Sequence, residues 1–379
     1  MNERKPKRWS KVILFVSLVS MSTASRSTQA NEVYRNDFQR PDKLRKNWST
    51  SHRDVTRQGD RSFLGRFGSE AVTLSIDKLP EHKYVRISFE LFIIGNWGGT
   101  SKDNAPDLWQ LSLDDGPLVV NASFSLWPKQ KEYPQSFPAN YPLARVTANT
   151  GAAEINSLGY VYGKKNRRND AVYKLRYVVP HRADTVVFNF SALGHRLQRF
   201  PEGTLLGTWG LDNVIVETLE RRTVTALDEA KLRQAWEALG SEDAIKARQA
   251  IWALIGADDQ TVAYMGKQLV DASAGPDLGK LIEQLDSDKF RSREAATKKL
   301  AEMVPFTKQE AARLATTLAR TKSAEVRARL GQILKANTSA PPRIHPEERR
   351  RRRVEYILEL IGTDSAKGML KKRRQNKAK

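Results

Sequence analysis

The chain has 379 residues, of which 40% are hydrophobic and 28% are charged, and its formal net charge is +21. This length allows two or three domains with cores of their own, and the composition excludes wholesale disorder. The sequence contains no cysteine, which excludes disulfides, thiolate catalysis and cysteine-ligated metal centres.

Residues 1–30 have the pattern of a signal peptide. A basic stretch from Arg4 to Lys11 precedes an apolar run of ten residues, Val12 to Met21. A membrane-spanning helix needs about 20 residues, so the run predicts a signal peptide with cleavage after Ala24 or Ala30. An uncleaved N-terminal anchor is the alternative. In both cases the body of the protein is exported, to the periplasm, the cell surface or the medium. An exported chain without cysteine indicates a bacterial source.

Residues 31–220 alternate apolar and polar side chains, and Gly, Pro, Asn and Asp separate the alternating segments. This period of two is typical of half-buried antiparallel strands. About eight short strands predict an antiparallel β-sandwich, a jelly roll of two packed sheets. The clearest segments are Ala71–Ile76, Lys83–Ile94, Asp107–Asp114, Pro117–Ser125, Ala171–Val179 and Thr185–Leu193.

From residue 223 the pattern changes to that of amphipathic helices rich in Ala, Glu, Lys and Arg. Three segments repeat, aligned on Arg248, Arg293 and Arg327, and each carries an apolar residue three positions later. Such repeats are typical of helix pairs that stack into an α-solenoid. The segment Asp286–Met303 resembles a HEAT unit. We therefore expect residues 223–340 to form a HEAT-like helical repeat domain after the sandwich.

Several peptides of the β half resemble secreted bacterial jelly-roll domains of the galactose-binding-like class, which includes carbohydrate-binding modules. The resemblance rests on an Asn-Asp-Phe opening at residues 36–38 followed by Trp48, and on a last strand ending Leu-Asp-Asn-Val at residues 211–214. It implies that the first and last strands are neighbours and that the domain recognises a glycan or cell-surface polysaccharide.

The same resemblance implies a structural calcium ion held by Asp37 and Asp212. Gln39 departs from the pattern, because an acidic residue often follows the opening Phe, and an amide is a poorer calcium ligand. The alternative is that Asp37 is a turn residue and Asp212 a hydrogen-bonded carboxylate at a strand end.

Two loops combine the aromatic rings and polar groups that sugar binding requires. They run from Gly95 to Trp109 and from Ser125 to Pro142. The alternative is that their aromatic side chains close the ends of the sandwich, and Trp109, which alternates with Leu111, is expected in the core. The predicted glycan-binding residues are Trp97, Asn104, Asp107, Trp127 and Tyr133.

Motifs for catalysis are absent from the sequence. Glycosidases need two facing carboxylates about 5 to 9.5 Å apart, and Glu90 is the only acid within its predicted strand. The five histidines lack metal-ligand spacing, and neither a nucleophile elbow nor a phosphate-binding loop occurs. The sequence therefore predicts a binding protein rather than an enzyme, with no cofactor beyond the calcium ion.

Residues 341–379 are expected to form a basic terminal helix and a disordered tail, because residues 342–379 alone carry a net charge of +8. Pro346 suits a first helical turn, Val354, Ile357, Leu358 and Ile361 form one apolar stripe, and disorder is expected for Lys371–Lys379. Five consecutive arginines surround this helix and predict a general cationic end, the alternative being a solvated charge run. They are Arg349, Arg350, Arg351, Arg352 and Arg353.

These observations predict an exported binding protein in which the sandwich recognises a glycan and the helical repeats contact protein or an anionic surface. Candidate anions are acidic polysaccharide, lipopolysaccharide and phospholipid headgroups, whereas export disfavours nucleic acid. One alternative is a purely structural or interaction protein that binds no sugar. Another is a protein that binds polyanions, such as nucleic acid, through the basic C-terminal half.

Overall fold

The computed structural model describes residues 30–40, 46–100, 105–114, 116–129, 133–162, 167–194, 197, 206–271, 278–303, 306, 308–339, 344 and 346–377. The expected signal peptide lies outside these residues, except for Ala30. Within the described part of the chain, no helix combines the length and apolar character needed to cross a membrane.

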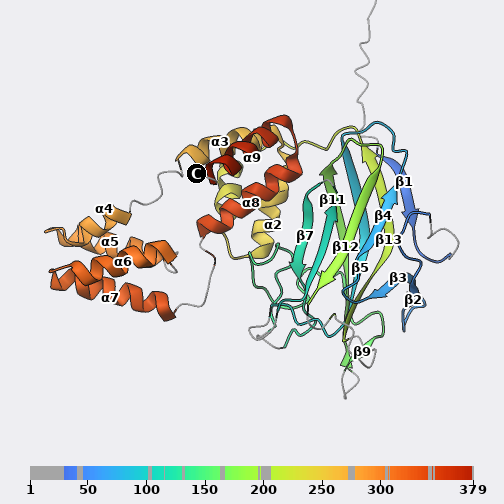
Figure 1. Cartoon of the computed structure of the whole chain (residues 1–379), viewed down its shortest axis with the longest axis horizontal. Coiled ribbons are helices and arrows are strands. Elements are labelled where there is room, and N and C mark those ends of the chain that lie inside the picture. Colours follow the sequence, from blue (N-terminus) through green and yellow to red (C-terminus); the bar gives the residue numbers. More distant parts are fainter. Residues whose placement is uncertain are drawn as a thin grey trace, which may run out of the picture.

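The first half is an antiparallel β-sandwich, as the alternating pattern predicts (Figure 1). Sheet A has the order β2 (Arg53–Val55), β3 (Ser62–Phe67), β13 (Gly207–Leu219), β5 (Tyr84–Gly95), β11 (Asp170–Pro180) and β8 (Glu154–Ile155), with β1 (Asn31–Asn36) also paired to β13. Sheet B has the order β4 (Val72–Ile76), β12 (Val186–Leu193), β6 (Leu108–Leu113) and β7 (Leu118–Ser123). A small separate pair consists of β9 (Val161–Tyr162) and β10 (Arg167–Arg168).

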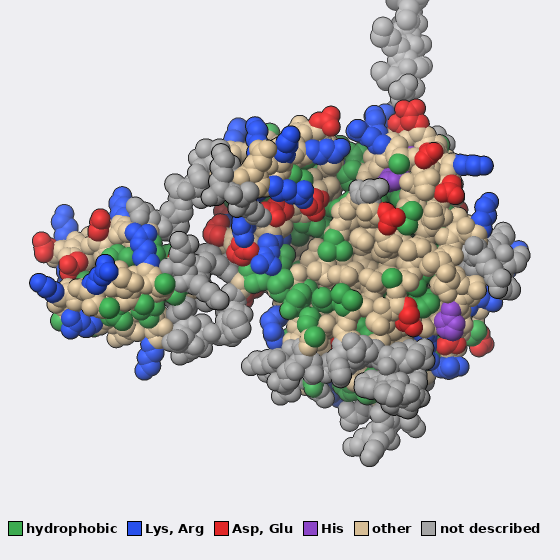
Figure 2. Space-filling model, viewed as in Figure 1, with side chains coloured by type: hydrophobic (Ala, Val, Ile, Leu, Met, Phe, Trp, Pro, Cys, Tyr) green, Lys and Arg blue, Asp and Glu red, His purple; other side chains and the backbone are tan. Residues whose placement is uncertain are grey.

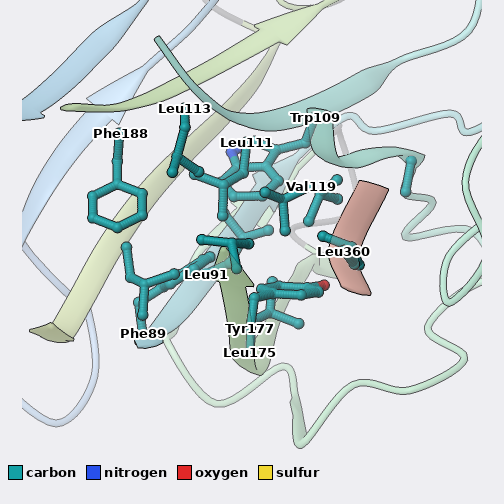
Figure 3. Packing of buried hydrophobic residues seen from close by; sticks show 14 of the residues in the cluster. Phe89, Leu91, Trp109, Leu111, Leu113, Val119, Leu175, Tyr177, Phe188 and Leu360 are labelled. Atoms are coloured by element: carbon teal, nitrogen blue, oxygen red, sulfur yellow. The ribbon is translucent and has the colours of Figure 1, made fainter. Parts of the chain in front are cut away.

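The core of the sandwich lies between the two sheets. Strand β5 turns Phe89 and Leu91 inward, whereas Glu90 lies on the outer face of sheet A. Trp109 is fully buried and packs near Phe89, which confirms its predicted place in the core (Figure 3). The first strand, β1, pairs with the last strand, β13, so the neighbourhood implied by the resemblance is also confirmed.

The second half is helical, and its helices pack in pairs, as predicted (Figure 1). In the described residues the helices are α1 (Glu229–Ala238), α2 (Ala244–Gly256), α3 (Asp259–Asp271), α4 (Leu278–Leu285), α5 (Phe290–Glu302), α6 (Lys308–Arg320), α7 (Ala324–Ser339), α8 (Pro346–Ile361) and α9 (Asp364–Lys377). The contacts are α1 with α2, α4 with α5, α6 with α7, and α8 with α9.

The helices belong to two hydrophobic cores. Buried side chains of α1, α2, α3, α8 and α9 are continuous with the core of the sandwich, and α8 also packs against β11. Helices α4 to α7 bury a separate cluster that includes Leu285, Leu300, Leu314 and Leu330. The helices that share the core of the sandwich therefore come from two stretches of sequence, with α4 to α7 between them.

The apolar stripe predicted for α8 is confirmed, because Val354, Ile357, Leu358 and Ile361 are all fully buried. The expectation of disorder after Lys371 is corrected, since residues 371–377 form the last part of α9. Helix α9 is held by its own buried Leu370 and Ala366 and by contacts with α3 and α8. This packing stabilises the basic segment as a helix.

Truncation after Ser339, which removes α8 and α9, will destabilise the sandwich itself. The deletion removes at least five fully buried apolar side chains from the shared core, each worth about 1.5 to 3 kcal/mol, so the free energy of unfolding will fall by more than about 5 kcal/mol. Urea unfolding followed by tryptophan fluorescence measures this, with truncation after Lys377 as the control. An unchanged unfolding curve after removal of both helices would contradict the shared core.

Candidate functional site

Partly exposed aromatic rings gather at one end of the sandwich, around the loop that follows β5. The indole Nε1–H of Trp127 donates to Oδ1 of Asn96 at 3.1 Å, and Nδ2 of Asn96 donates to the hydroxyl of Tyr162 at 3.1 Å. The two rings meet edge to face, with their centroids 6.0 Å apart. We call Asn96, Trp127 and Tyr162 the aromatic rim.

The aromatic rim is built by three segments that the fold brings together. Asn96 follows β5, Trp127 follows β7, and Tyr162 ends β9. The backbone N–H of Leu126 donates to the carbonyl of Trp97 at 3.1 Å, which joins the first two segments. The two aromatic rings are half buried and held by hydrogen bonds, so they present a fixed flat surface with polar edges. A sugar ring can stack on such a surface.

The structure assigns different places to the five residues predicted to bind a glycan. Trp127 is partly exposed, and so is Tyr133, next to Pro134, whose carbonyl accepts from the Thr100 N–H at 2.7 Å. Asn104 lies outside the described residues. The remaining two, Trp97 and Asp107, are corrected below.

Trp97 and Asp107 cannot touch a ligand as they stand, because both side chains are fully buried. The indole of Trp97 packs on Phe124 and donates to the carbonyl of Thr208 at 2.9 Å. The carboxylate of Asp107 accepts from the backbone N–H of Gly98 at 2.7 Å, so it fixes the loop that carries Asn96. These two residues support the rim from behind rather than forming its surface.

Sequence reasoning missed Asn96 and Tyr162. Asn96 lies within the loop that was singled out, next to the more conspicuous Trp97. Tyr162 comes from a strand of two residues, whose place depends on a hairpin that period-two analysis does not detect. No local signal in the sequence pairs Tyr162 with Trp127, because they are neighbours only through the fold.

The two predicted calcium ligands have separate partners. Asp37 is exposed, and its Oδ1 accepts from the backbone N–H of Gln39 at 3.2 Å, as a turn residue does. Asp212 is only 2% exposed, and its Oδ2 accepts from the guanidinium of Arg61 at 3.1 Å. In the described parts of the chain, no three His, Cys, Asp or Glu side chains are grouped so that they could hold a metal ion.

Positive charge at this position comes from Lys174, whose Nζ lies 3.4 Å from Glu90, and above all from Arg61. Its guanidinium pairs with Glu90 and Asp212, which face each other on β5 and β13, lies 3.7 Å from Glu154, and stacks over Phe92 at 4.6 Å. A calcium ion beside Asp212 would have to displace this cation, so the donors present do not fit calcium. Burial raises the pKa of Asp212 to about 6, although hydrogen bonds from Asn213 and Arg61 act in the opposite direction.

The arginine run of α8 is corrected from a general cationic end to a set of contacts that are mainly structural. Arg353 is 1% exposed and donates to the carbonyls of Leu239, Ser241 and Leu143 at 2.8, 2.7 and 3.2 Å. Arg349 is 4% exposed and donates to the carbonyl of Gly240 at 2.8 Å.

Both buried guanidinium groups therefore cap the C-terminal end of α1, where free carbonyls and the helix dipole favour a cation. Arg350 lies over the ring of Trp236, also in α1. Arg351 and Arg352 are about half exposed, at 46% and 48% of their side chains, and both pair with Glu348. Only these two members of the run face solvent to that extent, so the expected cationic end is much reduced.

No protein-family model matches the chain, and no curated protein matches it. Solved structures give distant matches to its fold. Dimeric latent PorU from Porphyromonas gingivalis matches with a TM-score of 0.25 and 10% identity over 44% of this chain and 11% of PorU.

Two further structural matches contain carbohydrate-binding modules. One is the C-terminal CBM6 of LamC, a laminarinase from Zobellia galactanivorans, with a TM-score of 0.19 and 11% identity over 50% of this chain and 98% of that one. The other is the CBM22-1 and GH10 modules of an endo-1,4-beta-D-xylanase from Clostridium thermocellum, with a TM-score of 0.21 and 10% identity over 60% and 36%. These likenesses concern the fold and assign no ligand to this chain.

Replacement of Arg61 by Gln will lower the free energy of unfolding by about 3 kcal/mol at pH 8, because Asp212 then stays buried without its counter-ion. The loss will be smaller at pH 5. The folded pKa of Asp212, about 6, is above the unfolded value of 3.8. Stability linked to this carboxyl is therefore complete below pH 3.8 and declines as the pH rises through 6, and protonation at pH 5 removes the unpaired charge.

Urea unfolding of the Arg61→Gln variant at both pH values tests this. Arg57→Gln is the matched control, because Arg57 lies near the same face of sheet A but its side chain is 59% exposed and 3.9 Å from Asp54. Equal losses at pH 5 and pH 8 would show that the titration of Asp212 is not involved.

Proposed function

We propose that this chain is an exported, non-enzymatic protein whose β-sandwich binds a carbohydrate at the aromatic rim. The observation that supports this is the partly exposed pair of Trp127 and Tyr162, both bonded to the amide of Asn96. Rings that are already held in place lose little conformational freedom when a pyranose stacks on them. The Tyr162 hydroxyl accepts from Asn96 and keeps its own hydrogen to donate to a sugar hydroxyl.

Binding without hydrolysis is supported by the arrangement of the buried acids. Glu90 and Asp212 are the cross-strand carboxylates of sheet A, and Arg61 pairs with both. The Arg61 guanidinium offsets one of these two negative charges, Lys174 lies 3.4 Å from Glu90, and both acids are held in an ion-pair network. A glycosidase instead leaves one carboxylate free to act as acid and the other as base or nucleophile. The proposal therefore assigns this pair to the stability of the sheet.

In the same proposal the helical part contacts protein or an anionic surface. Phe290, at the start of α5, is 62% exposed and is an apolar contact residue on α4 to α7. With Arg349 and Arg353 buried, attraction of an anionic surface rests on Arg351, Arg352 and the exposed lysines of α9, in the helical part where Figure 2 shows many Lys and Arg side chains. Both contacts would be additional to sugar binding.

Replacement of Trp127 by Ala will weaken glycan binding about tenfold or more, because it removes the stacking surface. A glycan array probed with the full mature chain identifies a ligand, and titration calorimetry then compares the affinities of the variants. Tyr162→Phe will give a smaller loss, since the ring remains. Phe290→Ala is the matched control, as an exposed aromatic residue outside the rim.

Two outcomes would contradict the proposed site. If the wild-type chain binds no glycan on the array, the purely structural alternative is favoured. If Trp127→Ala binds the identified glycan as tightly as the wild type and Phe290→Ala does too, the sugar site lies elsewhere on the sandwich.

A further inference from the structure

A pocket of about 180 Å³ lies where the helices meet the sandwich, at a different place from the aromatic rim. The sandwich contributes β7, the loop containing Phe137 and Tyr141, and Tyr177 of β11, while α2 contributes Trp252 and α8 contributes Tyr356. Figure 3 shows Tyr177 of β11 and Leu360 of α8 among the buried residues of the shared core. The walls are mostly apolar and aromatic.

Three arginines also line the pocket: Arg248 of α2, and Arg352 and Arg353 of α8. The residues that line it include no Asp or Glu. Arg352 pairs with Glu348 at 2.7 Å, whereas Arg248 and Arg353 donate to backbone carbonyls, and Arg248 also lies over the Phe137 ring and is hydrogen-bonded to Tyr177. The Nε of Arg353 is buried, and no partner for it occurs among the described residues. The pocket is thus apolar in its walls and positive in charge.

Arg248 differs from the aligned arginines of the other two repeats, because its side chain lines this pocket. The aligned arginines of the other two repeats each close the turn before their own helix. Arg293 donates to the carbonyl of Ser287 at 2.7 Å, and Arg327 donates to the carbonyl of Thr321 at 2.9 Å, six residues earlier in both cases. Arg248 instead donates to the carbonyl of Pro138 in the sandwich at 3.4 Å and lies 5.1 Å from the ring of Phe137.

The size and composition of the pocket limit the ligand to a small ring. A cavity of about 150 Å³ lined by apolar side chains holds a benzene molecule, so 180 Å³ accommodates a six-membered ring with one substituent. Trp252, Tyr177 and Tyr356 offer surface to the faces of such a ring. A guanidinium prefers carboxylate or phosphate oxygens, and a carboxylate is the smaller group.

We propose that this pocket binds a small organic acid, a carboxylate carried on a six-membered ring, with the charge met by Arg248 and Arg352 and the ring placed against Trp252 and Tyr356. Binding here joins the sandwich to α2 and α8, so it occurs between the two halves of the shared core. The site is independent of sugar binding at the aromatic rim. An aromatic acid and a sugar acid share the required chemistry, and the experiment distinguishes them.

The test uses the full mature chain and titration calorimetry with benzoate and with glucuronate. Benzamide and glucose are their respective neutral analogues. We expect one of the two acids to bind about tenfold or more tightly than its neutral analogue, because the charge-assisted hydrogen bonds require the carboxylate. Benzoate binding identifies an aromatic acid, and glucuronate binding identifies a sugar acid. If neither acid binds at millimolar concentration, or if acid and neutral analogue bind equally, the proposal is overturned.

Variants locate the binding within the chain. Arg352→Gln changes a half-exposed side chain and is expected to leave the fold intact, and Arg248→Met keeps the apolar part of its side chain over Phe137. Each should weaken acid binding about tenfold, while Arg248→Lys should retain more of it than Arg248→Met. Arg291→Gln, on the exposed surface of α5, is the matched control.

The Trp127→Ala variant should bind the acid like the wild type, which separates this site from the aromatic rim. Wild-type affinity in the folded Arg352→Gln variant together with wild-type affinity in Arg248→Met would place the acid outside this pocket and overturn the proposal.

Discussion

The molecule depends on the docking of α8 against both α1 and the sandwich. The apolar stripe of α8 enters the shared core, and beside it the guanidinium of Arg353 is removed from water. A buried cation without hydrogen bonds would cost several kcal/mol, so the carbonyls of Leu239, Ser241 and Leu143 must be held where Arg353 can reach them. Two of these carbonyls follow α1 and the third belongs to the sandwich. One side chain therefore requires three segments of the chain to keep a single relative position.

The burial of Arg353 also lowers its pKa to about 10, and the neighbouring charge of Arg349 acts in the same direction. The group remains protonated at neutral pH, so its positive charge stays inside the interface. A second guanidinium is held in a similar way on the outer face of sheet A, where Arg61 lies between Glu90 and Asp212. In both places a guanidinium is held inside the protein by oxygen acceptors, because its planar set of donors can bond several oxygens at once.

Much of the fold could be predicted from the sequence, because periodicity records which side of an element is buried. The alternation of β5 and the stripe of α8 both led to the correct elements with the correct buried faces. The site was harder to predict for a physical reason. Whether an aromatic side chain is exposed to a ligand or buried beneath the site depends on which other segments cover it. Trp97 is buried and Trp127 is partly exposed, although both lie in Gly- or Pro-containing loops. The arginine run failed as a prediction for the same reason, since helical geometry gives directions around α8 but does not reveal that α1 lies beside Arg349 and Arg353.

The order of the chain has a consequence for how the protein is made. The sandwich is complete in sequence by Leu219, yet part of its core surface is covered by α8, which begins at Pro346. A ribosome releases the N-terminal part first, so that surface stays uncovered while more than a hundred further residues emerge. During this interval an apolar area next to β11 is open to chaperones, to other unfinished chains and to proteases. The residues from Pro346 onward are thus the ones that end this period of exposure, and a chain cut short before α8 would keep this surface uncovered.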